Sequence, residues 1–246
     1  MLKEGEHIDD LHRNGYVIIQ DKDRFCFGTD AVLLSEFAKI GKKDKVLDLG
    51  CGNGILPILL CARNKKCESA LPHFTGLEIQ EDSIDLAMRS IELNVLKDRI
   101  SIKQGDIKDV ANIFKGQKFD VVVSNPPYIK SETPNISDHK AIARHERLCT
   151  LEDVAKAATT VLKFSGSFFM VHRPTRIVDI ITVLRDYQLE PKLIRFVHAT
   201  ADKEPKLVLI KATKGGRPMC KVLPPLIMYK DDGTYTDEVH NIYYGD

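Results

Sequence analysis

Val46-Leu-Asp-Leu-Gly-Cys-Gly-Asn-Gly54 is the stretch that decides the fold predicted for this chain. It opens as a short apolar strand, passes through a glycine-rich turn and continues into the helical pattern of 55–62. Such a unit is typical of a site where the backbone approaches a ligand closely. The glycine spacing differs from the Gly-x-Gly-x-x-Gly that cradles a pyrophosphate, and the carboxylate of Asp48 would repel one. We therefore predict a nucleoside ligand that is cationic or lacks phosphates. The turn glycines are Gly50, Gly52 and Gly54.

Two further carboxylates stand where later strands are predicted to end. The strand 74–79 carries Glu78, and an acid at this place can accept both hydroxyls of a ribose. The strand 100–106 ends in Asp106, which is suited to accept an adenine amino group. Each acid alone is more typical of a helix N-cap. Three acids at successive strand ends, Asp48 included, indicate one shared crevice, because these ends converge in an open α/β sheet.

The segment Phe119–Tyr128 predicts a fourth strand that ends in a tip rich in hydrogen-bond acceptors. The β-branched run 121–123 is typical of a buried strand. In the following Asn125-Pro-Pro-Tyr128, two carbonyls precede imide nitrogens, so the tip offers acceptors without competing donors. The Asn125 side chain and the Tyr128 ring would complete a site for a planar amino group. Taken alone, these four residues are more typical of a turn.

The remaining sequence predicts further alternation of strands and helices. Thr29 or Asp30 is expected to cap a helix over 31–38, and the Thr29 hydroxyl alternatively faces a ligand at the free N–H groups of the helix start. The helix predicted over 82–94 has a buried face formed by Ile84, Ala87, Met88, Ile91 and Val95. Strands are predicted over 16–19, 166–172, 192–197 and 206–211, helices over 151–162 and 175–187, and one edge strand over 226–229. We expect a single domain over 1–246, with its core over 25–213, an extension over 1–24 and a tail over 214–246.

Composition places the chain among soluble globular proteins. Of 246 residues, 43% are hydrophobic and 29% are charged, and the net charge is +1. The six cysteines form no Cys-x-x-Cys pair, so neither a zinc site nor a disulfide framework is expected. The first residues lack the apolar core of a signal peptide, and no apolar run reaches the roughly 20 residues of a membrane span. We therefore expect a cytoplasmic protein with no metal ion and no membrane partner.

Charge is unevenly distributed along the second half of the chain. Residues 161–221 carry 12 Lys or Arg against 5 Asp or Glu, whereas 222–246 carry one against five. A basic flank of this size suits phosphate contacts, although a solvated surface explains it equally well. The polar segment 129–149 is long for a connection, which favours a binding loop. The candidate RNA contacts are Lys130, Lys140, Arg144, Arg147, Lys214 and Arg217.

Together these motifs resemble those of class I S-adenosylmethionine-dependent methyltransferases over residues 25–213. The resemblance implies a Rossmann-like α/β fold, with a seven-stranded, mostly parallel sheet, helices on both faces and an antiparallel last strand. It also implies S-adenosyl-L-methionine as cofactor and S-adenosyl-L-homocysteine as product. The implied cofactor-binding residues are Thr29 (near the methionine end), Asp48, Gly50, Gly52, Gly54, Glu78, Asp106 and Asn125. The catalytic motif of enzymes that methylate adenine N6, guanine N2 or glutamine N5 is matched by Asn125, Pro126, Pro127 and Tyr128.

Short segments at the start of the core and in the tail narrow the resemblance to one bacterial branch, which contains enzymes that methylate adenine N6 in a valine tRNA along with members of unassigned substrate. The branch is matched by Phe27–Leu34, Lys214–Arg217 and Leu223–Ile227. This resemblance implies a tRNA substrate. The target amino group would donate hydrogen bonds to Asn125 and to the Pro126 carbonyl, bonds that strengthen as positive charge builds on the nitrogen.

Other substrates stay open. Guanine N2 in ribosomal RNA is the second candidate, and protein glutamine N5 is the third, because such enzymes carry a helical domain where this chain has 24 residues before Phe25. DNA adenine enzymes need a separate target-recognition region, for which little length remains. A non-catalytic cofactor- or RNA-binding module is the alternative from a different class. The sequence leaves the oligomeric state open, and a monomer is compatible with it.

Overall fold

The computed structural model describes residues 2–22, 28–63, 72–126 and 149–245. Seven long strands form its central sheet: β3 (Lys45–Leu49), β4 (His73–Glu78), β5 (Ile100–Gln104), β6 (Phe119–Ser124), β7 (Leu162–His172), β8 (Leu189–His198) and β9 (Pro205–Lys214). They follow the order β8-β9-β7-β6-β3-β4-β5. Neighbours are parallel except at β9, which runs antiparallel to β7 and β8. This confirms the predicted Rossmann-like sheet with its last strand antiparallel.

Two short strands lengthen the sheet beyond β8. They are β10 (Lys221–Val222) and β11 (Leu226–Ile227), and both pair with β8 in parallel. The sequence predicted one short edge strand in this tail, and the structure has two. The sheet therefore has nine strands among the described residues.

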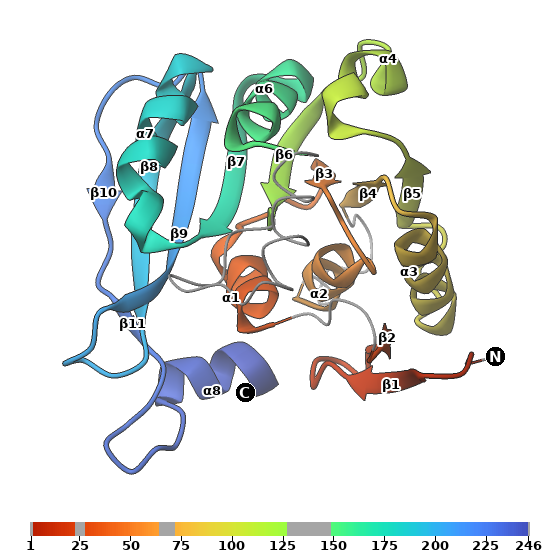
Figure 1. Ribbon diagram of the computed structural model, residues 1–246, viewed down its shortest axis with the longest axis horizontal. Helices are drawn as coiled ribbons and strands as arrows, with labels where there is room; N and C mark the ends of the chain where they lie inside the picture. Colours follow the sequence, from red (N-terminus) through yellow and green to blue (C-terminus); the bar gives the residue numbers. More distant parts are fainter. Residues whose placement is uncertain (1, 23–27, 64–71, 127–148, 246) are drawn as a thin grey trace, which may run out of the picture.

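Helices cover both faces of the sheet, and Figure 1 shows the two groups on opposite sides. One group is α1 (Thr29–Phe37), α2 (Ile55–Arg63) and α3 (Glu81–Leu93), joined at the C-terminus by α8 (Asp237–Tyr244). The other group is α4 (Val110–Phe114), α6 (Leu151–Val161) and α7 (Ile177–Asp186), with the short 3-10 turns η1 (Ile107–Asp109) and η2 (Pro174–Arg176). The hairpin β1 (Glu6–Asp10) and β2 (Val17–Asp21) lies beside α3.

Alternation along the strands divides the core into two layers. Val121 and Val123 face the layer of α1 and α2, whereas Val122 faces the layer of α6 and α7. All three are almost fully buried, which agrees with the β-branched run in the sequence. Burying one such side chain stabilises the fold by about 1.5–3 kcal/mol. This two-sided burial fixes the register of β6 and therefore the position of the tip that follows it.

Strand direction gives the sheet two unlike edges. We call the edge where the six parallel strands end the carboxyl edge, and β9 begins there. We call the opposite edge the amino edge: the six strands begin there and β9 ends there. The six strands are β3, β4, β5, β6, β7 and β8. The helices α2, α3, α4, α6 and α7 run antiparallel to the parallel strands, because each connects the end of one strand with the start of the next, and α1 likewise leads into the start of β3. Helix N-termini therefore lie at the carboxyl edge and helix C-termini at the amino edge.

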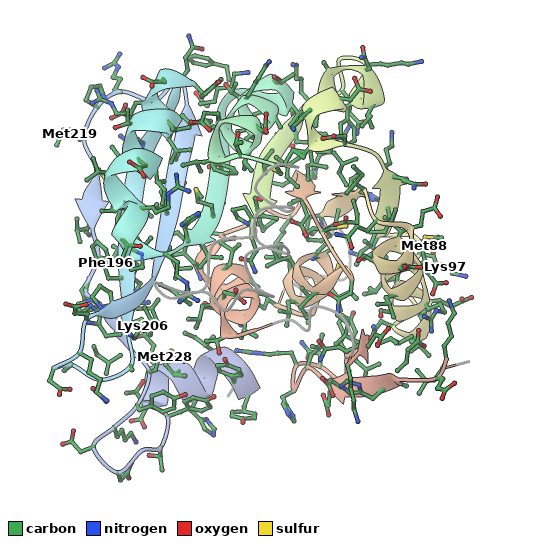
Figure 2. All side chains as sticks on the ribbon, viewed as in Figure 1. Met88, Lys97, Phe196, Lys206, Met219 and Met228 are labelled. Atoms are coloured by element: carbon green, nitrogen blue, oxygen red, sulfur yellow. The ribbon has the colours of Figure 1, made fainter. Side chains whose placement is uncertain are left out.

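Two local predictions are wrong. The N-cap of α1 is Gly28 rather than Thr29 or Asp30, and because glycine has no side chain the helix has no side-chain cap. The Asp30 carboxylate accepts from the N–H of Ala31 inside the first turn. On α3, Met88 is 52% exposed at the outer side of the helix (Figure 2), and Leu86 is buried instead. Val95 lies beyond the end of α3 with φ of 56°, so it cannot continue the helical face.

None of the helices in the described residues combines the length and apolar character that crossing a bilayer requires. Among the same residues, no group of His, Cys, Asp and Glu side chains could hold a metal ion. The cysteines that the structure describes, Cys51, Cys61, Cys149 and Cys220, are free thiols.

Candidate active site

A pocket of about 310 Å³ opens at the carboxyl edge, where β3, β4, β5 and β6 end. It brings together seven of the residues that the sequence singled out: Asp48, Gly50, Gly52, Glu78, Asp106, Asn125 and Pro126. A larger hollow of about 590 Å³ lies between α1, β8 and α8 and contains none of them. The smaller pocket is therefore the candidate site.

The glycine turn after β3 has two functions. Gly50, Gly52 and Gly54 have φ of 75°, 53° and 81°, a region that side chains rarely tolerate. A Cβ at Gly50 or Gly52 would meet no atom within 4 Å, so the backbone there is open toward the pocket. A Cβ at Gly54 would lie 3.2 Å from the Cβ of Ala87 on α3. Gly54 thus permits close packing of α3, while Gly50 and Gly52 present the backbone to a ligand.

Glu78 fixes the shape of this turn. Its Oε2 accepts a hydrogen bond of 2.9 Å from the N–H of Gly52, and its Oε1 accepts from the N–H groups of Ile79 and Gln80 at 2.8 and 2.9 Å. Each carboxylate oxygen has two lone pairs, so Oε1 is fully used and Oε2 keeps one acceptor site for a ligand hydroxyl. Glu78 therefore links the ends of β3 and β4 and also faces the pocket.

Asp48 is the residue that most clearly needs a ligand. Its side chain is 1% exposed, and the described residues give neither carboxylate oxygen a hydrogen-bond donor. Burial, and next the nearby charge of Glu78, raise the pKa of Asp48 well above its ordinary value. A buried carboxylate without partners is costly unless a cation or a donor reaches it. The ammonium group and the uncharged nucleoside of S-adenosylmethionine fit this carboxylate and the open glycine backbone beside it.

Asp106 and several apolar residues complete the lining of the pocket. Asp106 caps η1 by accepting from the N–H of Lys108 at 2.8 Å, and it also lines the pocket. Ile79 and Ile107, each one residue after a predicted strand-end acid, line the pocket together with Cys149 and Val154. We did not predict these apolar residues. The signal that could have found them is the apolar residue directly following Glu78 and Asp106, since strand-end neighbours share one edge.

The tip of β6 reaches the pocket with Asn125 and Pro126. Ser124 is fully buried, and its hydroxyl donates a 2.9 Å hydrogen bond to the carbonyl of Leu49 at the end of β3. This bond ties the tip to the strand that carries Asp48, so the relative position of Asp48 and Asn125 is set by the sheet. Other predicted residues lie outside the described part of the chain: Pro127, Tyr128, Lys130, Lys140, Arg144 and Arg147.

Thr29 lies at the start of α1, and its side chain is hydrogen-bonded to the hydroxyl of Tyr243 in the C-terminal helix. Among the described residues that line the pocket, α1 contributes Ala31 rather than Thr29. Thr29 is thus near the pocket but engaged by the tail.

Lys214 and Arg217 do not join the site. Lys214 ends β9 at the amino edge, where its Nζ donates to the carbonyls of Thr159 and Leu162 at 2.5 and 3.0 Å. Burial and the charge of Lys118 lower its pKa. Arg217 follows at the same edge, and its carbonyl accepts from Lys192. The structure therefore separates this basic segment from the pocket by the length of the strands.

Comparison with known proteins agrees with this architecture. A family model described as a methyltransferase domain matches residues 40–206. Proteins named tRNA1(Val) (adenine(37)-N6)-methyltransferase match most of the chain. The one from Bacteroides thetaiotaomicron is 30% identical over 80% of this chain and 81% of its own, and the one from Porphyromonas gingivalis is 29% identical over 74% and 72%.

Solved structures share the fold. A predicted O-methyltransferase from Agrobacterium tumefaciens superposes with a TM-score of 0.69 at 21% identity, covering 88% of this chain and 96% of that one. The 16S rRNA N2 G1207 methyltransferase of T. thermophilus, solved with AdoMet and guanosine, gives 0.60 at 18% identity over 87% and 52%. The matched model spans the glycine turn, the strand-end acids and the β6 tip. The chain therefore belongs to the methyltransferase-domain family and is an enzyme that uses S-adenosylmethionine as its methyl donor.

Proposed function

We propose that the protein methylates the exocyclic N6 of an adenine in tRNA, as a single methyltransferase unit in the cytoplasm. The observation that carries the proposal is the Asn125-Pro126 tip, which shares one pocket with Asp48 and Glu78. An acceptor-rich tip beside a methyl donor suits an amino nitrogen. The names of the relatives from B. thetaiotaomicron and P. gingivalis favour adenine N6 in tRNA.

The cofactor side of the pocket has a distinct task for each residue. Asp48 would accept from the ammonium group, Glu78 from a ribose hydroxyl and Asp106 from the adenine amino group. Gly50 and Gly52 allow the backbone to approach the ligand. Bound in this way, S-adenosylmethionine supplies a methyl group on a positively charged sulfur.

The substrate side must make a poor nucleophile reactive, because the lone pair of adenine N6 is delocalised into the ring. The two amino hydrogens would donate to the Asn125 side-chain oxygen and to the Pro126 carbonyl, which favours a pyramidal nitrogen with its lone pair free. These bonds strengthen as positive charge develops on nitrogen, so they stabilise the transition state more than the ground state. Alignment of the reacting atoms within about 3–3.5 Å supplies further rate. The product nitrogen is acidic and loses its proton to solvent after transfer, so no general base is required.

Incubation of the protein with methyl-labelled S-adenosylmethionine and different methyl acceptors tests the proposed substrate. Separate reactions contain bacterial tRNA, ribosomal RNA and a protein extract, and labelled nucleosides and residues are identified by mass spectrometry. The expected product is N6-methyladenosine in tRNA, and Asn125→Ala serves as the catalytic control. N2-methylguanosine in ribosomal RNA or N5-methylglutamine in protein would overturn the assignment of substrate. Absence of label in every fraction would indicate a non-catalytic binding module.

A further inference from the structure

The C-terminal tail carries three stacked tyrosines that the proposed reaction does not use. Tyr229 and Tyr235 stack with ring centroids 5.3 Å apart and planes at 20°, and Tyr235 and Tyr243 stack at 5.2 Å and 10°. We call Tyr229, Tyr235 and Tyr243 the tyrosine row. Tyr235 in the middle and Tyr243 at one end are half-buried, whereas Tyr229 at the other end is 39% exposed. An exposed aromatic ring at the end of a stack offers a face on which another flat ring can continue it.

The tyrosine row lies at the same edge of the sheet as the pocket. β11 pairs with the end of β8, and the N–H of Tyr229 donates a 2.9 Å bond to the carbonyl of Ala199, just beyond that strand. At the other end of the row, Tyr243 is bonded to Thr29, and Ala31 on the same helix lines the pocket. From β6 to β8 there are three strand spacings, and Tyr229 follows β11 on the far side of β8, so four spacings, or about 19 Å, separate it from β6. Tyr229 is thus a few nucleotides away from a base held by Asn125.

The tail is held in place before any partner binds. The carbonyl of Ile242, near the end of α8, accepts 2.9 Å bonds from both Arg13 of the hairpin turn and Arg63 of α2. Thr236 caps the start of α8, and its hydroxyl donates to the carbonyl of Ile227 at 2.8 Å. In Figure 1, α8 accordingly lies directly beside α1. A surface fixed in this way loses little conformational entropy on binding.

Positive side chains lie between the tyrosine row and the pocket. Lys203 and Lys206 are exposed around the start of β9, and Arg173, at the end of β7, donates a 3.1 Å bond to the carbonyl of Lys206. Two acids of α8 are paired with cations: Asp237 with Lys230 at 2.7 Å and Glu238 with Arg195 at 2.8 Å. The pairing limits the repulsion that the acidic tail would exert on a phosphate backbone.

We propose that the tyrosine row is a stacking platform for single-stranded RNA that flanks the methylated base, with Tyr229 as its open face and Lys203 and Lys206 as phosphate contacts. The proposal rests on the proposed function only in taking RNA as the substrate. Stacking on an aromatic ring tolerates any base, so the row would hold the RNA without reading its sequence.

The test compares Tyr229→Ala with Tyr229→Phe, which keeps the ring, and with Phe164→Ala, which removes an exposed ring at the amino edge. Binding of fluorescently labelled bacterial tRNA is titrated at several salt concentrations, and melting curves verify folding. Tyr229→Ala should raise the Kd for tRNA about 5- to 100-fold, as loss of one base stack does. Tyr229→Phe and Phe164→Ala should leave the Kd within about twofold of wild type.

Salt dependence separates stacking from charge. Tyr229→Ala should leave the slope of log Kd against log salt unchanged, whereas Lys206→Ala should reduce it by about one. A folded Tyr229→Ala protein with wild-type tRNA affinity would overturn the platform, even if methylation of tRNA is fully confirmed. Conversely, if the wild-type protein methylates only ribosomal RNA or protein in the labelling experiment, the proposed function is overturned by a measurement that does not involve Tyr229. Loss of affinity in Tyr229→Phe as well would show that the hydroxyl, and not stacking, matters.

Discussion

The two edges of the sheet treat charged side chains in opposite ways. At the carboxyl edge, Asp48 is buried with both oxygens lacking a donor from the described residues, and Gly50 and Gly52 face open space. At the amino edge, Lys214 is bonded to two carbonyls, and Lys163 pairs with Asp120 at 2.5 Å. Both edges are rich in charge, but in the part of the chain that the structure describes the buried carboxylate without a hydrogen-bond donor, Asp48, lies at the carboxyl edge. The density of charge in a sequence therefore identifies a ligand site less well than an unsatisfied group does.

Helix direction explains this difference. Helix N-termini lie at the carboxyl edge, where their free N–H groups attract carboxylates. Asp106 accepts such a bond at η1, and Asp153 accepts one in the capping box of α6. Helix C-termini lie at the amino edge, and their free carbonyls attract cations, as those of α6 attract Lys214. Lys214 of the basic segment therefore has structural partners in the fold itself, which composition could not reveal.

The largest effect should come from the tip of β6. Asn125→Ala should reduce turnover by about 10²- to 10³-fold, the cost of removing one group that stabilises transition-state charge. The affinity for S-adenosylmethionine should change by no more than about twofold, because Asp48, Glu78 and the glycine turn are untouched. Single-turnover kinetics and calorimetry measure the two quantities. Turnover equal to wild type would exclude Asn125 from catalysis.

Asp48→Asn should separate ligand binding from stability. Loss of a charged hydrogen bond to the ammonium group should weaken the binding of S-adenosylmethionine about 10- to 150-fold. The same change should raise the melting temperature of the cofactor-free protein at neutral pH, because it removes a buried charge that has no donor among the described residues. Calorimetry and thermal melts of both proteins measure these opposite shifts.

The pH dependence of stability should show that ionised Asp48 destabilises the cofactor-free protein. Burial raises the pKa of Asp48, so below the ordinary carboxyl range both folded and unfolded chains hold the proton and Asp48 costs no stability. As pH rises toward the raised pKa, the unfolded chain ionises first, and the cofactor-free wild type should lose stability that Asp48→Asn retains. A variant whose stability falls with pH in parallel with wild type would show that Asp48 already has a partner in the protein.

Sequence patterns predicted what depends on strand order and strand ends. The glycine turn and the positions of Glu78 and Asp106 follow from short-range periodicity, and the sheet then brings them together. The partners of Lys214 are about 50 residues away in sequence, at Thr159 and Leu162, so they depend on packing that no local pattern encodes. Helix α8 was missed for a related reason. It is eight residues long, and both the burial of Val239 and Ile242 and the bonds from Arg13 and Arg63 depend on distant segments.

An intermediate effect is expected at the amino edge. Lys214→Met keeps the apolar stem but removes the donor to Thr159 and Leu162, which should lower the free energy of unfolding by about 1–3 kcal/mol. Affinities for S-adenosylmethionine and for tRNA should equal those of wild type, because the residue lies away from the pocket. Urea unfolding and tRNA titrations measure both. A tenfold weaker tRNA complex would instead show that RNA reaches this edge and would restore Lys214 as an RNA contact.

The smallest effect should come from the surface pair at the same edge. Lys163 and Asp120 are about half and one-quarter exposed, and ion pairs of this kind contribute about 0–1 kcal/mol. The Asp120 carboxylate also accepts from the N–H of Lys45, at the start of β3, so Lys163→Met leaves that bond in place. Its unfolding midpoint should move slightly and more at low salt than at high salt, since exposed pairs are screened. A loss of several kcal/mol in the free energy of unfolding would mean that the pair fixes the register of β3 and β6. The charges of the amino edge would then be as important for the fold as those of the carboxyl edge are for the ligand.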